Sequence, residues 1–472
     1  MQFPEIISRI NATVWGLGTQ LFLVGTGAFL TIRCRFLPWR YLPRAMKGIF
    51  SPAARRQTAG GVSPLASLMT ALAATLGTGN LAGVSTALIC GGPGALVWME
   101  ISALFGVSTA FAECMLASRY RVRGTDGQTR GGPMYVMRSA IRPRALGRFL
   151  AASFSAFTVL ASFGVGGMTQ SAAIADALGF VCTLPRKAVA AVVSLLALAV
   201  ISGGIRRISA LATAAVPLMS VLYVAGGLWV IFQNFPALPE ALSVMFRAAF
   251  SPDAAAGGIA GVTVSAFTAA RYGIARGCYS NEAGMGSAAI SAAAADGVHP
   301  VQQGYIAMTA PVIDTILLCT ITGLAVCVSG VLGVTDAAGE SVSGALLTIL
   351  AFRSQLGTAG VILVCACLVL FGFSTIPGWE YMGEEAFRFL AGRRAVPLYR
   401  AVFVASVWLG GVWNSELLWQ LSDICNALMC FPNLVCLLLL SGTVAQEIRA
   451  YPPEGTPGKP PRRRRRGARK FQ

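Results

Sequence analysis

The sequence predicts an all-α integral membrane protein with about eleven transmembrane helices. Of its 472 residues, 55% are apolar and only 12% are charged, and the mean hydropathy is +0.67. A soluble protein of this length could not bury such a share of apolar side chains. Apolar windows of about 20 residues, the length that crosses roughly 30 Å of hydrocarbon, recur along the whole chain. Two of these windows are interrupted by glycine and asparagine, which predicts broken helices inside the membrane.

The eleven expected spans follow from the apolar windows taken in order. They cover residues 14–33, 63–89, 93–118, 149–178, 187–204, 208–233, 257–290, 301–331, 357–378, 397–414 and 421–443. The first window has no basic segment before it and no small-residue cleavage site after it. We therefore expect a membrane span there and not a cleaved signal peptide.

Lysine and arginine gather in the connections that would lie on one side of this topology. They fall mainly in residues 33–56, 119–148, 205–207 and 388–400 and in the tail from Arg449. By the positive-inside rule this side is cytoplasmic, so we expect an N-terminus outside and a C-terminus inside the plasma (inner) membrane. The net charge of +18 is then mostly a signal of topology. We expect the basic tail, residues 446–472, to be disordered and to contact anionic lipid, and we expect no nucleic acid partner.

Cysteine and histidine give no sign of catalysis or of a metal centre. Most of the 12 cysteines fall within or at the ends of the expected spans, where a thiol behaves as a small apolar group. Cys365 and Cys367 lack the second cysteine pair or nearby histidine that a zinc site needs. His299 is the only histidine, and the sequence contains no DDxxD or HExxH motif. We therefore do not expect an enzyme.

Three stretches depart from the pattern of a lipid-facing helix. TLGTGNLAGV at 75–84 places glycines two residues apart inside the second span, although each costs about 1 kcal/mol in a helix interior. RYGIARGCYSNEAGMGSAAI at 271–290 places four glycines in the seventh span, and FSTIPGWE at 373–380 ends the ninth. The first two stretches occupy the first helix of two successive five-helix sets. Because these two helices are five spans apart, which is an odd number, the two sets cross the membrane in opposite senses.

This arrangement predicts an inverted repeat. Its expected parts are an extra N-terminal helix with a basic cytoplasmic loop (1–56), a first repeat (57–233), an extracellular loop (234–256) and a second repeat (257–445). Broken helices at matching positions indicate a binding site at the membrane midplane, where unwound carbonyls coordinate a cation and helix N-termini meet an anionic group. A channel, the alternative, would repeat polar groups along a continuous pore.

Seven motifs are spread from the second span to the last. They are GTGNLAGV at 77–84, GGPGALVWM at 91–99, GGPMYVM at 131–137, ARGCYSNEAGMGSA at 275–288, IDTILLCTITGL at 313–324, FSTIPGW at 373–379 and FPNLV at 431–435. In these motifs the chain resembles the alanine or glycine:cation symporter family, also called sodium:alanine symporters, over about residues 10 to 445. The resemblance implies a five-plus-five inverted-repeat fold with one extra helix. It also implies uptake of a small neutral amino acid such as alanine or glycine, driven by Na⁺ or, as an alternative, by protons.

The first broken helix offers groups for an amino acid zwitterion. The free amides of an unwound Gly77–Thr78–Gly79 segment can bind its carboxylate, because only glycine lets the backbone come close. Asn80 can turn its oxygen to a sodium ion or its NH₂ group to the substrate, or it can cap the second half of the helix. The resemblance adds further substrate-binding residues, namely Gln170, Tyr272, Gly273, Thr375 and Trp379.

A sodium site is implied by the same resemblance. The carbonyls of Ala73 and Leu76 and the hydroxyls of Ser374 and Thr375 would hold the ion between the first and eighth core helices. The alternative is that these hydroxyls only bond to the carbonyl four residues back. Trp379 lies four residues after Thr375 and would close the pocket against branched side chains, unless it is an aromatic residue of the membrane interface.

Acidic residues inside the spans are candidates for gating. An ionisable group there is costly unless it is paired or lines a water path, which draws attention to Glu282 and Asp314. Arg271 and Arg276 are the candidate partners of Glu282. We expect a salt bridge that serves a gate, with a static pair or direct cation binding as alternatives, and Glu113 is a weaker case of the same kind.

Two positions depart from the family pattern. Gly167 stands where an asparagine is usual, so a polar contact to the ligand from that position is in doubt. Glu100 stands where an aromatic residue is usual, near the end of a span where it can reach water.

Overall fold

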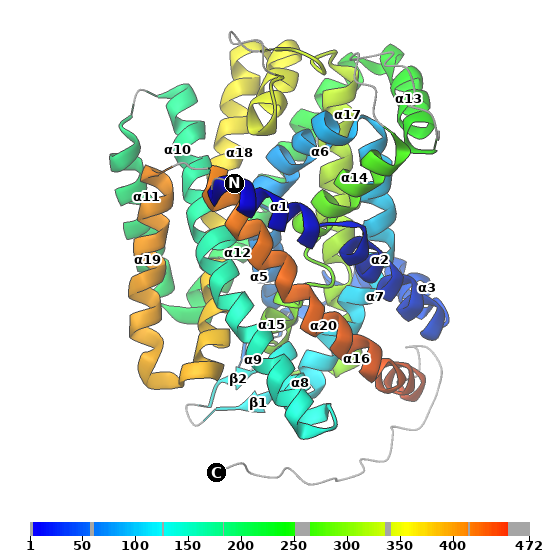
Figure 1. Ribbon diagram of the computed structural model, residues 1–472, viewed down its shortest axis with the longest axis vertical. Coiled ribbons are helices and arrows are strands. Elements are labelled where there is room, and N and C mark those ends of the chain that lie inside the picture. The colour runs from blue at the N-terminus through cyan, green and yellow to red at the C-terminus, as the bar shows by residue number, and fades with distance from the viewer. Residues whose placement is uncertain are drawn as a thin grey trace.

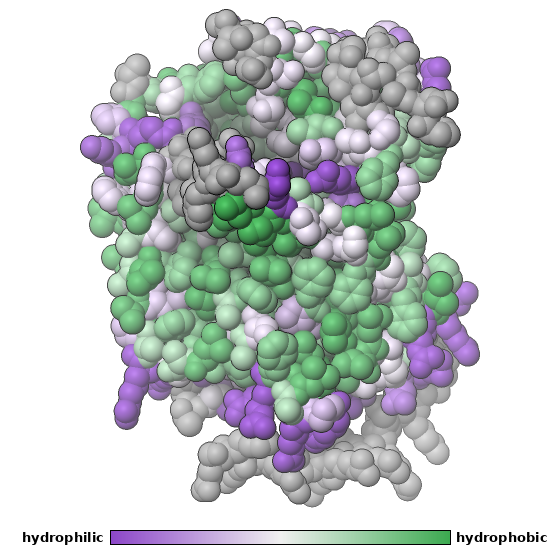
Figure 2. All heavy atoms as spheres, viewed as in Figure 1, coloured by the Kyte–Doolittle hydropathy of each residue, from purple (hydrophilic) through white to green (hydrophobic). Residues whose placement is uncertain are grey.

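The computed structural model describes residues 3–56, 61–124, 127–182, 184–250, 265–335, 341–413 and 416–451. These residues are almost all helical, and strands β1 (Val122–Arg123) and β2 (Thr129–Arg130) form a short antiparallel hairpin. Most helices run along the long axis of the molecule (Figure 1). An apolar band covers the middle of the surface, and hydrophilic residues gather at the lower edge and across the upper third (Figure 2). The protein is a multi-pass membrane protein, as the sequence predicts.

The N-terminal segment contains four helices. They are α1 (Phe3–Val14), α2 (Leu17–Arg33), α3 (Leu37–Gly48) and α4 (Pro52–Arg55). Together α1 and α2 are long and apolar enough to cross a membrane. At their junction, Trp15 Nε1 donates to the backbone oxygen of Asp423 at 3.1 Å, and Gln20 Nε2 donates to that of Arg271 at 2.9 Å. The extra helix is therefore fixed to two helices of the second half.

The first half of the core runs from α5 to α12. Its elements are α5 (Pro64–Thr75), the π-helix η1 (Gly79–Gly83), α6 (Val84–Gly91), α7 (Gly94–Arg119), α8 (Pro133–Ala140), α9 (Arg144–Ala161), the π-helix η2 (Ser162–Met168), α10 (Thr169–Val181), α11 (Arg186–Ile201) and α12 (Gly204–Gln233).

The second half follows a short connection. Its elements are the 3₁₀ turn η3 (Phe235–Ala237), α13 (Leu238–Phe250), α14 (Ala266–Asn281), α15 (Ser287–Ala293), α16 (Pro300–Ala307), the π-helix η4 (Val312–Cys319), α17 (Thr320–Val328), α18 (Gly344–Ala391), the 3₁₀ turn η5 (Arg393–Ala395), α19 (Val396–Val412) and α20 (Glu416–Ala450). Helix α7 packs along α14, and α12 packs along α18.

The predicted spans can be matched to these helices. By length and composition, eight helices of the described residues could cross a membrane, and the pair formed by α5 with η1 and α6, bent by 51°, makes a ninth. The two other expected spans correspond to α11, which has 16 residues, and to the broken element of α14 and α15. The all-α membrane fold and both broken helices are confirmed. The boundaries of the two repeats stay a prediction, and the tail from residue 452 lies outside the described residues.

The first break has a local cause. After α5 the backbone of Leu76 leaves the helical region, with φ −72° and ψ 86°. A Cβ atom built on Gly77 would lie 3.0 Å from Thr375 Oγ1, so only glycine fits comfortably between the broken helix and α18.

The second break is a short loop between α14 and α15. Glu282, Gly284 and Gly286 have φ values of 55°, 100° and 82°, a left-handed region that favours glycine. Asn433 of α20 donates one hydrogen bond to the Gly284 carbonyl at 2.9 Å and another to Glu113 of α7. Two neighbouring helices therefore hold the unwound segment in place.

The third predicted interruption is wrong. Helix α18 continues through Pro377 and ends only at Ala391, several turns beyond the expected end at residue 378. Proline removes a single backbone donor, and helices packed in a membrane tolerate this loss. The sharp change in α18 lies instead at Gly357, with φ 57° and ψ −137°.

Candidate functional site

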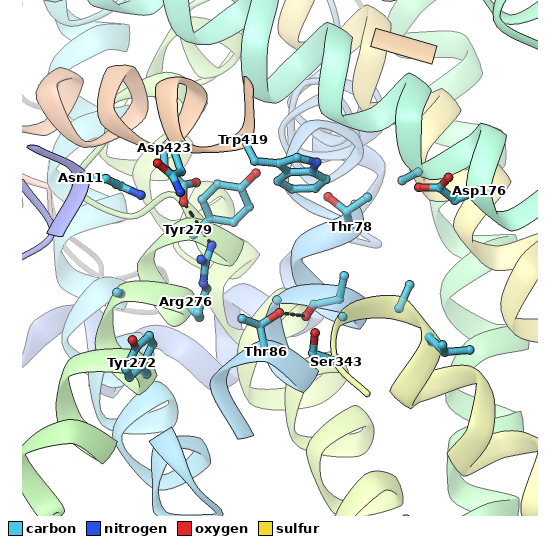
Figure 3. Close-up of a pocket in the computed structure, with 18 of the residues that line it drawn as sticks. Asn11, Thr78, Thr86, Asp176, Tyr272, Arg276, Tyr279, Ser343, Trp419 and Asp423 are labelled. Carbon is cyan, nitrogen blue, oxygen red and sulfur yellow. Dashed lines mark hydrogen bonds and ion pairs between the residues drawn. The ribbon is translucent and has the colours of Figure 1, made fainter. Parts of the chain in front are cut away.

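A cavity of about 780 Å³ lies at the end of the molecule near α1 (Figure 3). Helices α1, α6, α10, α14, α18 and α20 contribute to its wall. Thr78 lies beside the first break, Arg276 and Tyr279 come from α14, and Asp423 comes from α20. The cavity therefore connects this face of the protein with the first broken helix.

The predicted substrate residues of the first break lie together with Gln170. The Thr78 backbone N–H donates to Gln170 Oε1 at 3.4 Å, and Gln170 Nε2 donates to Thr78 Oγ1 at 3.3 Å. Gln170 Nε2 also donates to the carbonyl of Val165 in η2 at 3.1 Å. The Gln170 amide thus occupies one of the donors that the sequence assigns to a carboxylate, the Thr78 N–H, and this long contact is weak enough to be exchanged for a ligand.

Gly79 lies where the two broken helices meet. A Cβ atom at this position would be 3.3 Å from the Cα atom of Ser280, near the end of α14. The glycine therefore allows the start of η1 to approach the end of α14 closely. Thr78 and Gly79 are helical here, so the unwound segment is shorter than the predicted Gly77–Gly79 and covers Leu76 and Gly77.

Three of the four predicted sodium ligands converge. Thr375 Oγ1 lies 2.9 Å from the carbonyl oxygen of Ala73 and 3.3 Å from that of Leu76. It also lies 2.8 Å from the carbonyl oxygen of Phe371, four residues back on α18, which is the helix hydrogen bond that the sequence analysis names as the alternative. Ser374 Oγ instead donates to Phe371 at 3.0 Å and faces Met219 of α12.

Three of these oxygens fit a monovalent cation. A threonine hydroxyl carries one hydrogen and can satisfy only one of the three carbonyls around it. The Phe371 carbonyl lies within α18 and also accepts from the Ser374 hydroxyl, whereas the carbonyls of Ala73 and Leu76 approach Thr375 from the end of α5. Oxygen ligands without negative charge are suited to a hard cation such as Na⁺. The carbonyls of Ala73 and Leu76 and the Thr375 hydroxyl would hold Na⁺.

Asn80 contacts groups of the protein through both ends of its amide, and its predicted role toward a ligand stays a prediction. Its Oδ1 accepts from the Gly77 N–H at 3.2 Å, and its Nδ2 donates to Asp314 Oδ1 at 2.8 Å and to the Asp314 carbonyl at 3.1 Å. Asn80 therefore links the first break to η4.

Tyr272 and Gly273 lie farther along α14. Tyr272 lines the cavity, with the guanidinium of Arg271 5.6 Å from the centre of its ring. A Cβ atom on Gly273 would lie 2.9 Å from the Cβ atom of Trp98 on α7. Gly273 therefore serves the close packing of α14 on α7, and this structure does not place it toward the cavity.

Trp379 is fully buried, with 0% of its surface exposed, so it is not an interfacial aromatic residue. It lies one turn beyond Thr375 on α18, and a Cβ atom on Gly166 of η2 would overlap its side chain. A Cβ atom on the adjacent Gly167 would lie 3.0 Å from Ser406 Oγ on α19, so position 167 faces away from the first break. Trp379 is not among the residues that line the cavity.

The candidate gating residues have partners other than those predicted. Arg276 Nη1 lies 3.5 Å from Asp423 Oδ2, so α14 pairs with α20 at the cavity. The Glu282 carboxylate accepts a hydrogen bond from Ser287 at the start of α15. The chain turns at Glu282, and this turn carries its carboxylate away from the arginines of α14.

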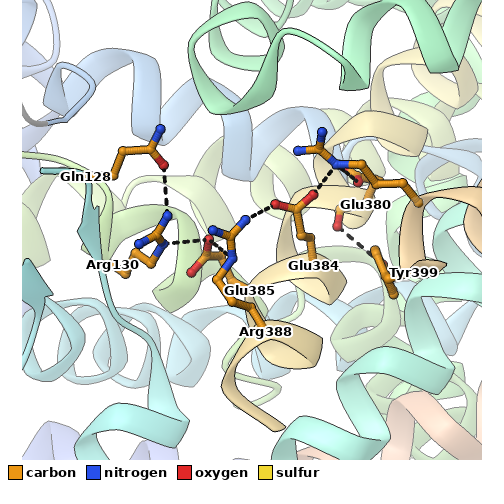
Figure 4. Close-up of polar contacts among 8 residues, drawn as sticks. Gln128, Arg130, Glu380, Glu384, Glu385, Arg388 and Tyr399 are labelled. Carbon is orange, nitrogen blue, oxygen red and sulfur yellow. Dashed lines mark hydrogen bonds and ion pairs between the residues drawn. The ribbon is translucent and has the colours of Figure 1, made fainter. Parts of the chain in front are cut away.

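An ion-pair network that the sequence does not predict lies beside the β-hairpin (Figure 4), which Figure 1 shows at the lower end of the molecule, well below α1. Arg388 pairs with Glu384, and its Nε lies 3.5 Å from Glu385 Oε1. Arg130 of β2 lies 3.3 Å from Glu385, and Arg400 of α19 lies 2.5 Å from Glu384. The network joins the β-hairpin, α18 and α19. The signal in the sequence is the spacing of Glu384 and Arg388, which places both on one face of a helix.

Comparison with known proteins agrees with this geometry. The family described as "Sodium:alanine symporter family" matches residues 1–464. The sodium/alanine symporter AgcS of Methanococcus maripaludis is 39% identical over 454 residues, which cover 96% of this chain and 98% of that protein. An uncharacterized transporter of Haemophilus influenzae is 42% identical over 454 residues, with 96% of each chain covered. The crystal structure of MhsT in complex with L-phenylalanine has the same fold, with a TM-score of 0.53, 15% identity and coverage of 82% of this chain and 100% of that one. The chain therefore belongs to the sodium:alanine symporter family.

Proposed function

We propose that this protein is a symporter that couples the entry of Na⁺ to the uptake of small neutral amino acids such as alanine and glycine. The observation that carries the proposal is the position of Thr375 Oγ1 within 3.3 Å of three backbone carbonyls, directly beside the first break. The relatives named above support the choice of ion and substrate.

The substrate site in this proposal is the first break. The substrate carboxylate replaces Gln170 Oε1 at the Thr78 N–H, and the released glutamine amide contacts the substrate. The fully buried Trp379 limits the space toward the other end of the molecule. In this proposal the space between the first break and the Trp379 ring accepts a methyl side chain, whereas branched side chains would overlap the ring.

Coupling follows from the closeness of the two sites. Ala73 and Leu76 carry proposed ion ligands, and Gly77 and Thr78 carry proposed substrate ligands. A sodium ion that ties this segment to α18 orders the backbone that the substrate needs, so each ligand raises the affinity for the other.

The two ends of the molecule suggest how access alternates. The cavity reaches the first break from the end near α1, and the ion-pair network crosses the opposite end. We propose that the cavity end is extracellular, as the positive-inside rule predicts, and that this structure has a closed cytoplasmic side. Inward release of substrate then requires the network to separate.

Thr375→Ala tests the proposed ion site. We expect the sodium concentration for half-maximal alanine uptake into proteoliposomes to rise more than tenfold, because the variant loses an ion ligand in a low-dielectric site. The apparent alanine affinity at saturating sodium should change less.

Thr158→Ala is the matched control. Thr158 is equally buried on α9, and its hydroxyl donates to the carbonyl four residues back at 2.8 Å, as Thr375 does. An unchanged sodium dependence in Thr375→Ala would make Thr375 an ordinary helix hydroxyl. Alanine uptake that follows a proton gradient in sodium-free medium would favour the proton-coupled alternative, and non-saturable flux would favour a channel.

A further inference from the structure

Tyr279 of α14 carries a buried hydroxyl without a hydrogen bond. The residue is 7% exposed, and its hydroxyl oxygen has no hydrogen-bond partner among the residues that the structure describes. The hydroxyl of Thr169 lies nearby, but it donates to the carbonyl of Val165 at 2.8 Å. A buried tyrosine hydroxyl normally has a partner, because an unpaired polar group in the interior costs free energy. Such a hydroxyl marks a place for a ligand if open space lies beside it.

The open space beside Tyr279 is the cavity near α1. Tyr279 and Thr78 both line this cavity. Figure 3 shows the Tyr279 ring between Asp423 and Trp419, with the hydroxyl on the side of Trp419 and Thr78. The guanidinium of Arg276 lies 5.6 Å from the centre of the ring, and it pairs with Asp423. The ring is therefore supported by this ion pair, and its hydroxyl is directed toward the first break.

Tyr279 also adjoins the contact between the two broken helices. A Cβ atom on Gly79 would lie 3.3 Å from the Cα atom of Ser280, the residue that follows Tyr279. Thr78 precedes Gly79 in the same way. The Thr78 N–H and the Tyr279 hydroxyl thus approach one space from two different helices, and the proposed function places the substrate carboxylate in this space.

A carboxylate can use both of these donors. It has two oxygens, and a hydrogen bond from the Thr78 N–H to one of them leaves the other oxygen free to accept. The tyrosine hydroxyl has one hydrogen to donate. A hydrogen bond from a hydroxyl to a charged oxygen is short and about twice as strong as one between neutral groups.

We propose that Tyr279 is a substrate-binding residue, whose hydroxyl donates a hydrogen bond to the carboxylate oxygen that Thr78 leaves free. The substrate carboxylate then joins the first broken helix to the second. Amino acids with a free carboxylate are selected over their neutral amides, because only the charged group gains the strong form of this hydrogen bond. The inference rests on the proposed function, to which it adds a residue that recognises the carboxylate.

Tyr279→Phe tests the inference, because it removes the hydroxyl and keeps the ring. The unpaired hydroxyl stabilises nothing in the ligand-free protein, so the Tm of the purified variant in sodium without alanine should equal that of wild type. The Kd for alanine at saturating sodium, measured by displacement of radiolabelled alanine, should rise at least about tenfold, the loss expected for one hydrogen bond to a charged group.

Tyr223→Phe is the matched control. Tyr223 of α12 is fully buried and is not among the residues that line the cavity. Its hydroxyl has a partner, Thr322 Oγ1, at 2.8 Å. Removal of this hydroxyl should lower the Tm of the ligand-free protein and leave the Kd for alanine unchanged, which is the reverse of the result expected for Tyr279→Phe.

Alaninamide identifies the group that Tyr279 contacts. In competition with alanine it should lose less affinity than alanine does on the change from wild type to Tyr279→Phe, because its carbonyl is neutral. An equal loss for alanine and alaninamide would overturn the assignment of the carboxylate.

The other outcomes separate this inference from the proposed function. An unchanged Kd for alanine in Tyr279→Phe would overturn the inference and leave the proposed function intact. A weaker Kd together with a fall in the ligand-free Tm equal to that of Tyr223→Phe would also overturn it, since the hydroxyl would then serve the fold. Absence of sodium-dependent alanine binding in the wild type would contradict the proposed function itself.

Discussion

Glu384 of α18 offers a quantitative test of the proposal that the network closes the cytoplasmic side. Its carboxylate pairs with Arg388 and with Arg400, and its side chain is 6% exposed. Glu384→Gln removes the charge from both pairs, and each hydrogen bond to a charged group is worth about 1.5–3 kcal/mol. Part of this loss is offset, because Arg388 keeps Glu385 at 3.5 Å and Arg400 keeps Glu380 at 3.7 Å. We therefore expect a net loss of about 2 kcal/mol in the closed state, and hence an open population about 30-fold larger.

The opening can be followed with a cysteine at a buried position behind the network. Ile208 is 2% exposed and lines a cavity of about 300 Å³ with Tyr381 and Glu384. In an Ile208→Cys, Cys182→Ala background, maleimide labelling from the cytoplasmic side should be about 30-fold faster after Glu384→Gln. Glu447→Gln is the control, because the pair of Glu447 with the 38%-exposed Arg119 is worth at most about 1 kcal/mol. Equal labelling rates with and without Glu384→Gln would refute the reasoning.

Three further predictions address the pocket, the topology and the energetics. Gly166→Ala should abolish alanine uptake, because the added methyl group overlaps the Trp379 side chain, and an active variant would contradict this packing. Trp379→Ala should allow leucine to compete for binding. Cys182 is the one exposed cysteine. A membrane-impermeant maleimide should therefore label the wild-type protein in intact cells and should not label Cys182→Ala. Labelling only in inside-out vesicles would show that the orientation is the reverse. Uptake of a neutral zwitterion with Na⁺ should carry inward current, because the ion brings one net positive charge, and uptake that does not depend on voltage would exclude this coupling. A tenfold sodium gradient with 100 mV supplies about 3.7 kcal/mol per ion, which is enough for roughly 500-fold accumulation of the substrate.

Much of the fold can be predicted from the sequence because the membrane imposes a simple rule. A helix must present about 20 apolar residues to cross the hydrocarbon, and a glycine pair inside such a window is unusual enough to mark a break. For this reason the breaks near Gly77 and Gly284 are found from the sequence alone. The prediction of an interruption at Pro377 is wrong because a single proline is an ambiguous signal: packed membrane helices tolerate it, and α18 continues through it.

The partners at the site are harder to predict. Asp423 lies 147 residues from Arg276, and nothing local in the sequence connects them. By contrast, the contact of Thr375 with the Phe371 carbonyl is local, because a helix hydroxyl commonly donates to the carbonyl four residues back. The proximity of Asn80 and Asp314, 234 residues apart, arises only from packing of η1 against η4.

The three π-helical segments carry a consequence for how this chain can change by insertion and deletion. η1 contains Asn80, η4 contains Asp314, and η2 supplies the Val165 carbonyl that holds Gln170. A π turn accommodates one residue more than an α turn. Deletion of one residue from such a turn would leave hydropathy almost unchanged and would restore an α turn, so the flanking helix keeps its register while the side chains within the turn point in new directions. A relative that has lost one of these residues would therefore keep its membrane topology while it presents a different set of side chains to its ligands.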